Sequence, residues 1–321
     1  MPAHPATTTA AAAPVKARTL RVTVLAGGPS AEREVSLASG TAIAAALRRH
    51  GHDVLVADIG PDNLAALDEP ADVVFPALHG PFGEDGTVQR LMQQRGLRYV
   101  GSDATASATA MDKVATKVLV AADNIDTPAY EVWDAETLTT RARPDLALPV
   151  IVKPTDQGSS VATTIVRTPD EFPPAVRKTL AASPHALVEQ FIAGDEITVG
   201  IVGRRTLPPI CVRPKRGFYD YTAKYEDDAT EYLFDAGHPA ALLACAQDLS
   251  LRVFDRLGCR HLARVDWMAD PAGRLWFLEI NTLPGLTSHS LVPKAAARAG
   301  VPFDELVERL VRMAHEDLTW R

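Results

Sequence analysis

The sequence predicts an α/β protein made of three successive units, and three observations support this. Apolar runs alternate with helical patterns over roughly the first hundred residues, as in a parallel sheet with crossover helices. A second set of strand-like runs begins at residue 149, and a third begins at residue 195. The chain of 321 residues is long enough for two or three domains with substantial cores.

The bulk composition excludes several classes of protein. Hydrophobic residues make up 46% and charged residues 23%, as in ordinary globular proteins, so disorder of the whole chain is excluded. A net charge of −7 argues against nucleic acid or an anionic membrane as the main partner. The three cysteines form no CxxC pair, which argues against disulfides and zinc and favours a reducing cytoplasm. No apolar run reaches the roughly 20 residues that span a membrane, and residues 1–18 predict a flexible tail.

The first unit offers a substrate site at its strand ends. Ligands of parallel sheets lie beyond the carboxyl ends of the strands, which here means loops 26–34 and 79–86. Glycines in the first loop let a ligand approach the backbone, and the helix start at Glu32 favours an anion. A tight turn and an acid that complements the helix dipole explain the same residues. The expected elements are strands over 20–27, 53–59 and 72–78 and a helix over 32–50.

The second loop of this unit begins with a histidine. His79 is placed to position a carboxylate, although a lone histidine is more often structural. We expect Glu84 and Asp85 to serve the start of the helix that follows them.

The later units contain one long irregular segment. Residues 214–237 show no clear periodicity, and such a length in a compact chain is usually a functional loop or lid. Lys224 and Tyr225 on it would close over bound substrates, unless it is only a surface loop. The other expected elements are two Ala-rich helices after residue 102, strands at 149–154, 186–192, 195–203, 261–270 and 275–281, helices near 170–182 and 239–257, and two terminal helices.

The last two expected strands carry a candidate metal site. Alternate side chains of a strand share a face, so Arg264 and Asp266 project together, as do Glu279 and Asn281. Two carboxylates and an amide are oxygen ligands of the kind that Mg²⁺ prefers, with phosphate and water completing its shell. The alternative is a row of ordinary polar positions on an exposed strand face.

Two lysines and an apolar strand suggest a nucleotide site. Lys113 and Lys153, with backbone amides of the turn 157–160, would suit a triphosphate. The segment 189–192 followed by Glu196 could form an adenine slot with a ribose acceptor. Two solvated lysines, a hairpin tip and a plain core strand explain the same residues, and the pattern is not a Walker motif.

These segments together resemble a known family. From about Arg21 to Ala314 the chain is similar to the D-alanine–D-alanine ligases of the ATP-grasp superfamily. The resemblance implies three α/β domains: an N-terminal parallel-sheet (pre-ATP-grasp) domain over 19–101, a central domain over 102–188 and a C-terminal domain over 189–321 with a lid at 214–237. It rests on the segments 27-GGPSAEREVSLASG-40, 79-HGPFGEDG-86, 111-MDK-113, 149-PVIVKPTDQGSS-160, 217-GFYDYTAKY-225, 264-RVDWM-268 and 279-EINTLPGLTSHSLVP-293.

The resemblance implies a reaction and its catalytic groups. One D-alanine carboxylate would attack the γ-phosphate of ATP, and the amine of a second D-alanine would attack the resulting acyl phosphate. Two Mg²⁺ ions, or Mn²⁺ in their place, would lie on Asp266, Glu279 and Asn281. Arg264 and the Gly285 amide would stabilise the oxyanion of the tetrahedral intermediate.

The resemblance also implies the binding residues. Glu32 would receive the first ammonium and be linked through Ser159 to Tyr225. The first and second D-alanine would lie against Glu32, Val35, His79, Ser290 and Leu291. ATP would contact Lys113, Ile151, Lys153, Ser159, Ser160, Glu189, Gln190, Ile192, Glu196, Phe218, Lys224, Met268 and Leu278. The family further implies a cytoplasmic homodimer that makes a peptidoglycan precursor.

Some positions depart from the family pattern, and two other functions stay open. Ala162, Gln190 and the segment 233–237 differ from the usual residues, which affects the lid and ATP affinity rather than a catalytic group. A ligase joining D-alanine to D-lactate or D-serine is the first alternative, and Tyr225 favours the dipeptide instead. A silent ATP-binding protein is the second, and the retained Lys153, Arg264 and acidic residues argue against it.

Overall fold

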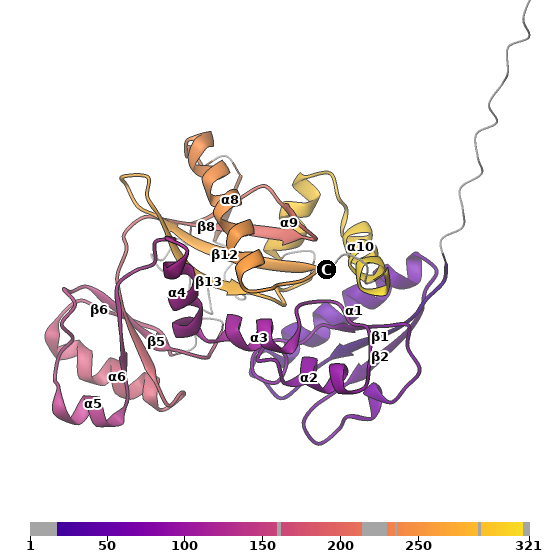
Figure 1. Ribbon diagram of the computed structural model, residues 1–321, viewed down its shortest axis with the longest axis horizontal. Helices are drawn as coiled ribbons and strands as arrows, with labels where there is room; N and C mark the ends of the chain where they lie inside the picture. Colours follow the sequence, from indigo (N-terminus) through magenta and orange to yellow (C-terminus); the bar gives the residue numbers. More distant parts are fainter. Residues whose placement is uncertain (1–17, 159–161, 214–229, 235, 288–289, 317–321) are drawn as a thin grey trace, which may run out of the picture.

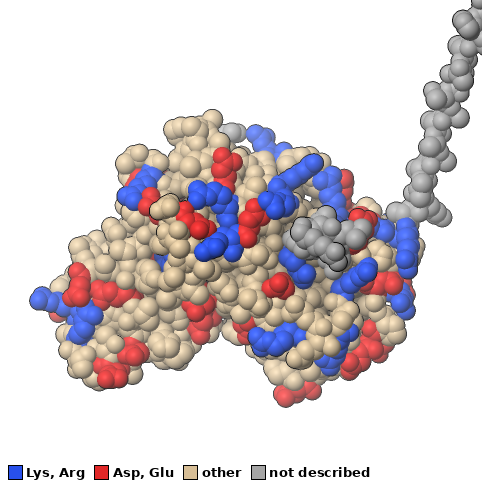
Figure 2. Space-filling view, in the orientation of Figure 1, with Lys and Arg blue, Asp and Glu red and all other residues tan. Residues whose placement is uncertain are grey.

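The computed structural model describes residues 18–158, 162–213, 230–234, 236–287 and 290–316. Figure 1 shows three sheet-containing parts, which confirms the predicted α/β class. The tail at 1–17 and most of the expected lid lie outside the described residues. None of the helices in the described ranges is both long and apolar enough to cross a membrane. Acidic and basic side chains are interspersed on the face shown in Figure 2.

The N-terminal sheet is parallel, as predicted. Its strand order is β2-β1-β3, and α1 and α2 cover its two faces. Helix α1 begins immediately after Glu32, so the loop after β1 leads directly to the helix N-terminus. The elements are β1 (Arg21–Ala26), α1 (Arg33–Arg49), β2 (Asp53–Asp58), the 3-10 helix η1 (Ala65–Leu67), β3 (Val73–Pro76) and α2 (Thr87–Gln94).

The central sheet is antiparallel in the order β4-β7-β5-β6. Trp133 and Phe172 pack edge to face in its core, with ring centroids 4.9 Å apart, and thereby fix α6 against the sheet. The elements are β4 (Tyr130–Trp133), α5 (Ala135–Thr140), β5 (Val150–Pro154), β6 (Thr164–Val166), η2 (Pro169–Glu171), α6 (Phe172–Leu180) and β7 (Ala186–Gln190).

The third sheet has the order β11-β10-β8-β12-β13, with β9 paired to β8. Helices α3, α4 and α8 pack on this sheet on one side, and α9 and α10 join it to the N-terminal part (Figure 1). The elements are α3 (Ala104–Met111), α4 (Lys113–Ala122), β8 (Asp195–Val202), β9 (Arg205–Thr206), β10 (Ile210–Arg213), β11 (Glu231–Leu233), α8 (Ala240–Arg256), β12 (Leu262–Ala269), β13 (Leu275–Asn281), α9 (Leu291–Arg298) and α10 (Phe303–Glu316).

The sheet pairing refines the expected domain limits. Strand β7 pairs along its whole length with β5, so the expected limit between 188 and 189 falls inside a strand. Helices α3 and α4 belong to the expected central domain by sequence, yet they pack against β13 of the third sheet. We propose that the central domain ends after Gln190 and that α3 and α4, which lead along the chain from the first part to the central sheet, pack as part of the third.

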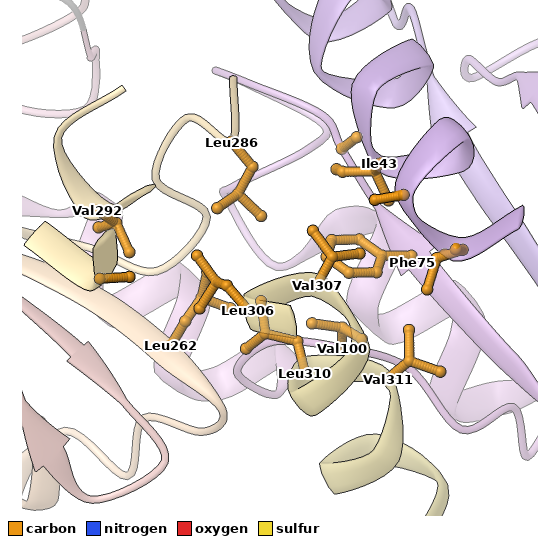
Figure 3. Close-up of a cluster of buried hydrophobic side chains, with 14 of the residues drawn as sticks. Ile43, Phe75, Val100, Leu262, Leu286, Val292, Leu306, Val307, Leu310 and Val311 are labelled. Carbon is orange, nitrogen blue, oxygen red and sulfur yellow. The ribbon is translucent and has the colours of Figure 1, made fainter. Parts of the chain in front are cut away.

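One hydrophobic cluster joins the beginning and the end of the chain. Side chains from α1, β3, β12, α9 and α10 meet between the N-terminal and third sheets. Figure 3 shows part of this cluster, including Ile43, Phe75, Leu262, Leu306 and Leu310. The edges of the two sheets that carry the predicted site residues are therefore fixed relative to each other by a shared core.

Candidate functional site

Strands β12 and β13 are neighbours in the third sheet. Arg264 lies opposite Asn281, and Asp266 lies opposite Glu279, so the pairing brings the four predicted residues together. The register shifts between Asp266 and Trp267, directly after the acidic position. A β-bulge commonly redirects a side chain beside an active site.

The buried carboxylate of Asp266 is held by two neighbours. Thr198 Oγ1 donates to it at 2.6 Å, and Arg264 Nε and Nη2 donate at 3.0 and 2.9 Å. On β13, Asn281 Oδ1 accepts from the Leu283 backbone amide at 2.9 Å. Two carboxylates and an amide on adjacent strands fit the oxygen donor set of Mg²⁺. Because Arg264 neutralises Asp266 here, a bound cation would share that carboxylate with the guanidinium or displace it.

A cavity of about 390 Å³ lies between the central and third sheets. Its walls combine apolar side chains with lysines and carboxylates, as expected of a site for a nucleotide. Phe191, within the segment expected to form an adenine slot, also lines it, and so does Arg213, which was not predicted. The predicted residues that line it are Lys113, Ile151, Lys153, Glu189, Gln190, Ile192, Glu196, Asp266, Met268, Leu278 and Glu279.

Glu189 is buried between two lysines in the wall of this cavity. Its Oε2 lies 2.6 Å from Lys153 Nζ, and its Oε1 forms an ion pair with Lys117. Burial alone would raise the pKa of Glu189, but the charges of Lys153 and Lys117 outweigh burial and lower it. Burial alone would likewise lower the pKa of Lys153, and the carboxylates of Glu189 and Glu279 raise it instead. The pair is therefore ionised at neutral pH.

A second, smaller cavity of about 110 Å³ lies between the N-terminal and third sheets. Lys113 and Glu279 line both cavities, so this point joins the two. Lys113 Nζ lies 3.4 Å from Glu279 Oε2 and donates to the Gln157 carbonyl at 2.7 Å. The predicted residues that line the smaller cavity are Glu32, Val35, His79, Lys113, Arg264, Glu279, Asn281, Gly285, Ser290 and Leu291.

Two loops converge on Glu32 at the start of α1. The Glu32 side chain is buried, and a Cβ built on Gly158 would lie 3.8 Å from its Oε2. The tip of the loop after β5 therefore approaches Glu32, as the expected link to Ser159 requires. Ser159 itself, with Ser160, Phe218, Lys224 and Tyr225, lies outside the described residues.

Glu84 turns toward the smaller cavity rather than serving the helix start. Its Oε2 accepts from the Gly80 amide at 2.5 Å, whereas Asp85 accepts from Thr87, the first residue of α2. Burial, with the charge of Glu32 added, raises the pKa of Glu84 to about 8. Burial also lowers the pKa of the neighbouring His79. The expectation for Glu84 was wrong because burial of the loop, which a sequence pattern does not show, directs the side chain inward.

Ser290, which also lines this cavity, stands at the N-cap of α9. Its Oγ accepts from the Thr287 amide at 3.1 Å and lies 2.9 Å from Thr287 Oγ1. The positive end of a helix dipole and its unpaired amides favour a carboxylate, which suits the predicted role of Ser290 and Leu291.

Asp195, which lines the larger cavity, forms a cluster with a cysteine and a histidine. Asp195, Cys211 and His238 place their polar atoms within 4.8 Å of one another, although no CxxC pair marks them in the sequence. Asp195 is paired with Arg213 at 2.7 Å and with His238 at 3.0 Å. Burial, followed by the negative charge of Asp195, raises the pKa of Cys211 to about 11. The ion pairs of Asp195 with Arg213 and His238 account for this cluster.

The sequence did not indicate Lys117 or the position of Glu84 in the wall of the smaller cavity. Lys117 follows Lys113 by four residues, and residues four apart share one face of a helix, so this spacing could have indicated it. Thr198 and Arg213, which support Asp266 and Asp195, had no signal in the sequence because their partners are distant along the chain.

Known proteins resemble the chain across most of its length. The family model described as D-ala D-ala ligase C-terminus matches residues 119–312, and the one described as D-ala D-ala ligase N-terminus matches residues 60–102. A D-alanine–D-alanine ligase of Gloeobacter violaceus is 46% identical over 91% of this chain and 98% of its own length. One of Syntrophotalea carbinolica is also 46% identical, over 91% of this chain and 95% of its own length.

Solved structures agree with these relatives. The D-alanine–D-alanine ligase of Bacillus anthracis complexed with ATP matches with a TM-score of 0.80 and 30% identity, covering 94% of this chain and 98% of that one. The VanG D-Ala:D-Ser ligase of Enterococcus faecalis matches with a TM-score of 0.82 and 26% identity, covering 92% and 100%. The chain belongs to the family of ATP-dependent D-alanine–D-alanine ligases.

Proposed function

We propose that the chain joins two molecules of D-alanine to D-alanyl-D-alanine, with ATP converted to ADP and phosphate, for peptidoglycan precursor synthesis. The observation that carries this is the junction of the two cavities at Lys113 and Glu279. A phosphate donor in the larger cavity and a carboxylate acceptor in the smaller one would meet at this junction. Relatives named D-alanine–D-alanine ligase at 41–46% identity support the same reaction.

The first step transfers the γ-phosphate to the carboxylate of the first D-alanine. A carboxylate oxygen forms a bond to phosphorus, and the bond between phosphorus and the β,γ-bridging oxygen breaks as ADP leaves. Lys113 and Lys153 neutralise phosphate oxygens, and Glu32 holds the substrate ammonium. Two Mg²⁺ ions on Asp266, Glu279 and Asn281 would supply further charge neutralisation when bound.

The second step forms the peptide bond. The amine of the second D-alanine, its carboxylate held by the N-terminus of α9, attacks the acyl carbon and loses a proton, and the phosphate leaves with the C–O bonding electrons. Arg264 and the Gly285 amide, which line the smaller cavity, stabilise the intermediate oxyanion. Tyr225 and Lys224 on the expected lid would exclude water from the acyl phosphate.

Phosphate release tests this function. The protein is incubated with ATP, Mg²⁺ and D-alanine alone, then with D-alanine plus D-serine or D-lactate, and the products are identified by mass. D-Alanyl-D-alanine from D-alanine alone supports the proposal, and chelation of Mg²⁺ should abolish it. Product only from a mixed pair would assign the chain to the second substrate class, and no release with any pair would contradict a ligase function.

We also propose a cytoplasmic homodimer. A cytoplasmic site is supported by the use of ATP, and dimer formation is supported by the outer strand β2, which exposes Leu55 and Val56. Exposed apolar side chains on an edge strand suit pairing with a second copy. Sedimentation equilibrium measures the mass, and a Leu55→Lys variant should shift it to that of one chain if β2 forms the interface.

A further inference from the structure

Lys117 is a buried lysine to which the proposed reaction assigns no role. It lies one turn after Lys113 on α4, but its side chain has no exposed surface, whereas Lys113 lines both cavities. Full burial of a lysine is costly unless its charge is paired and hydrogen-bonded. Lys117 is therefore a buried charged group that does not line the nucleotide cavity.

The interaction partners of Lys117 belong to both walls of the nucleotide cavity. Its Nζ forms an ion pair with Glu189 and donates to Thr127 Oγ1 at 2.5 Å. Thr127 in turn donates to the Phe277 carbonyl of β13 at 3.0 Å. Lys117 thus connects β13 of the third sheet to β7 of the central sheet, which are the two walls that enclose the cavity.

Glu189 divides its two oxygens between two lysines with different surroundings. Oε1 faces Lys117, which is fully buried, and Oε2 faces Lys153, which is 14% exposed and lines the cavity. Burial lowers the pKa of Lys117, and the carboxylate of Glu189 beside it opposes this effect. With both lysines protonated, one carboxylate balances one ammonium, so the three groups carry a surplus positive charge. Since Lys153 is the member that reaches the cavity, the surplus is available there for phosphate oxygens.

The pairing with two lysines also determines which hydrogen bonds Glu189 can make with a nucleotide base. An ionised carboxylate only accepts hydrogen bonds, and each of its oxygens has a second lone-pair direction besides the one used by a lysine. Such a group favours an exocyclic amine, as in adenine, and repels a carbonyl oxygen at the same place, as in guanine. With Lys117 removed, the buried carboxylate would have Lys153 as its remaining lysine and would turn toward it or take up a proton.

We propose, on the basis of the proposed function, that Lys117 is a positioning residue that orients Glu189 to select the adenine base and leaves the charge of Lys153 free for phosphate. It acts through these two residues and touches neither substrate. Two consequences separate this role from simple support of the fold: nucleotide affinity and base preference both depend on Lys117, while the D-alanine sites do not.

Lys117→Met, which keeps most of the length of the side chain and removes its charge, is the principal test. The KM for ATP should rise about tenfold, the value of one lost charge-assisted hydrogen bond. The preference for ATP over GTP in kcat/KM should fall by a similar factor of about ten. The KM values for D-alanine should stay within about twofold, because Glu32 and Ser290 lie in the other cavity.

A second variant separates the two parts of the role. Lys117→Met combined with Glu189→Gln removes the carboxylate that would otherwise neutralise Lys153. ATP affinity should then return to within about threefold of the wild-type value. Base preference should stay lost, because the amide of glutamine can present either a donor or an acceptor. Loss of affinity that the second substitution leaves uncorrected would overturn the charge argument.

Controls distinguish the inference from the proposed function. Dissociation constants for ATP and GTP, measured by calorimetry without D-alanine, do not depend on ligation. Arg309→Met, which removes a positive charge from the exposed surface of α10, should leave these constants unchanged. Wild-type protein that binds no ATP would refute the proposed function. Wild-type binding with unchanged ATP affinity and base preference in Lys117→Met, even at a lower unfolding temperature, would overturn the inference.

Discussion

At the scale of single residues, Glu84 couples stability to pH. Burial raises its pKa from 4.5 to about 8, so between these values the folded protein holds a proton that the unfolded chain releases. Its contribution to stability is complete below pH 4.5 and is lost as pH rises through about 8. The free energy of unfolding should fall by up to about 1.4 kcal/mol per pH unit in this window from this group alone.

Urea unfolding at intervals across this pH window measures the effect. Glu84→Gln has no proton to release, so its free energy of unfolding should vary less with pH than that of the wild type. The difference between the two proteins should grow from acid to alkaline pH. Parallel profiles for the two proteins would show that Glu84 is ionised in the folded state.

Arg264 is the residue whose loss should reduce turnover most directly. It lies beside Asp266 and lines the smaller cavity, where the oxyanion would form. Arg264→Ala should lower kcat by about 10²-fold or more, the value typical of an oxyanion donor. Arg264→Lys keeps the charge but loses the planar fork, so its kcat should be intermediate. Steady-state kinetics checks both, and unchanged turnover in the alanine variant would remove Arg264 from the mechanism.

Glu32 should act on one substrate and not on the other. It lines the smaller cavity and is absent from the wall of the nucleotide cavity as far as the described residues define it. Glu32→Gln removes the charge that would hold the first ammonium, so the KM for the first D-alanine should rise about tenfold or more. The KM for ATP should change little, and an equal increase in both constants would mean that the loop is misassigned.

At the scale of elements, the alternation of side chains along strands was enough to predict the heart of the site. The period of two places Arg264 and Asp266 on one face of β12, and the pairing of β12 with β13 brings Asn281 and Glu279 opposite them. Short elements with little periodicity escaped prediction, among them β4, α5 and β10. Strand β11 lies within the segment expected to be irregular. Each of these strands has only three or four residues and α5 has six, which is too few to establish a pattern, and packing against neighbouring elements decides their conformation.

Helix α8 packs against β12, the strand that carries Asp266. The buried Trp267 packs edge to face on Phe277, with centroids 5.7 Å apart, and its Nε1 donates to Ser250 Oγ on α8 at 2.8 Å. Trp267→Ala should cost about 3–5 kcal/mol of stability and also lower kcat, because Asp266 precedes it at the bulge. Chemical unfolding and kinetics measure these effects.

Ser250→Ala provides the matched comparison for that helix. It removes the hydrogen bonds of Ser250 Oγ with Trp267 and with the Ala246 carbonyl but leaves the ring in place, so it should cost about 1–3 kcal/mol and leave kcat unchanged. If both variants destabilised the protein while retaining full turnover, the packing of α8 would have no influence on the position of Asp266.

At the scale of the whole molecule, long-range packing is what the sequence could not show. The N-terminal and third sheets share one core, although their strands lie up to about 250 residues apart along the chain. Arg49 pairs with Asp304 at 2.6 Å, and His52 with Glu308 at the same distance, across the contact between α1 and α10. Each of these two helices has an amphipathic pattern, but the pattern does not identify the helix against which it packs. This contact helps to hold together the two sheets between which the smaller cavity lies.

The shared core predicts that these two sheets unfold together. Leu310 is fully buried in α10 among residues of α1, β3 and β12 (Figure 3), and Leu310→Ala should cost about 2–5 kcal/mol. Hydrogen exchange should then accelerate equally at amides of β1 and β8, because the cluster supports both sheets. Val176→Ala, in the separate core of the central sheet, should affect β5 and β7 and leave β1 unchanged. Faster exchange in β1 without β8 would mean that the N-terminal sheet opens alone, and that substrate could then enter the smaller cavity without disturbing the metal ligands.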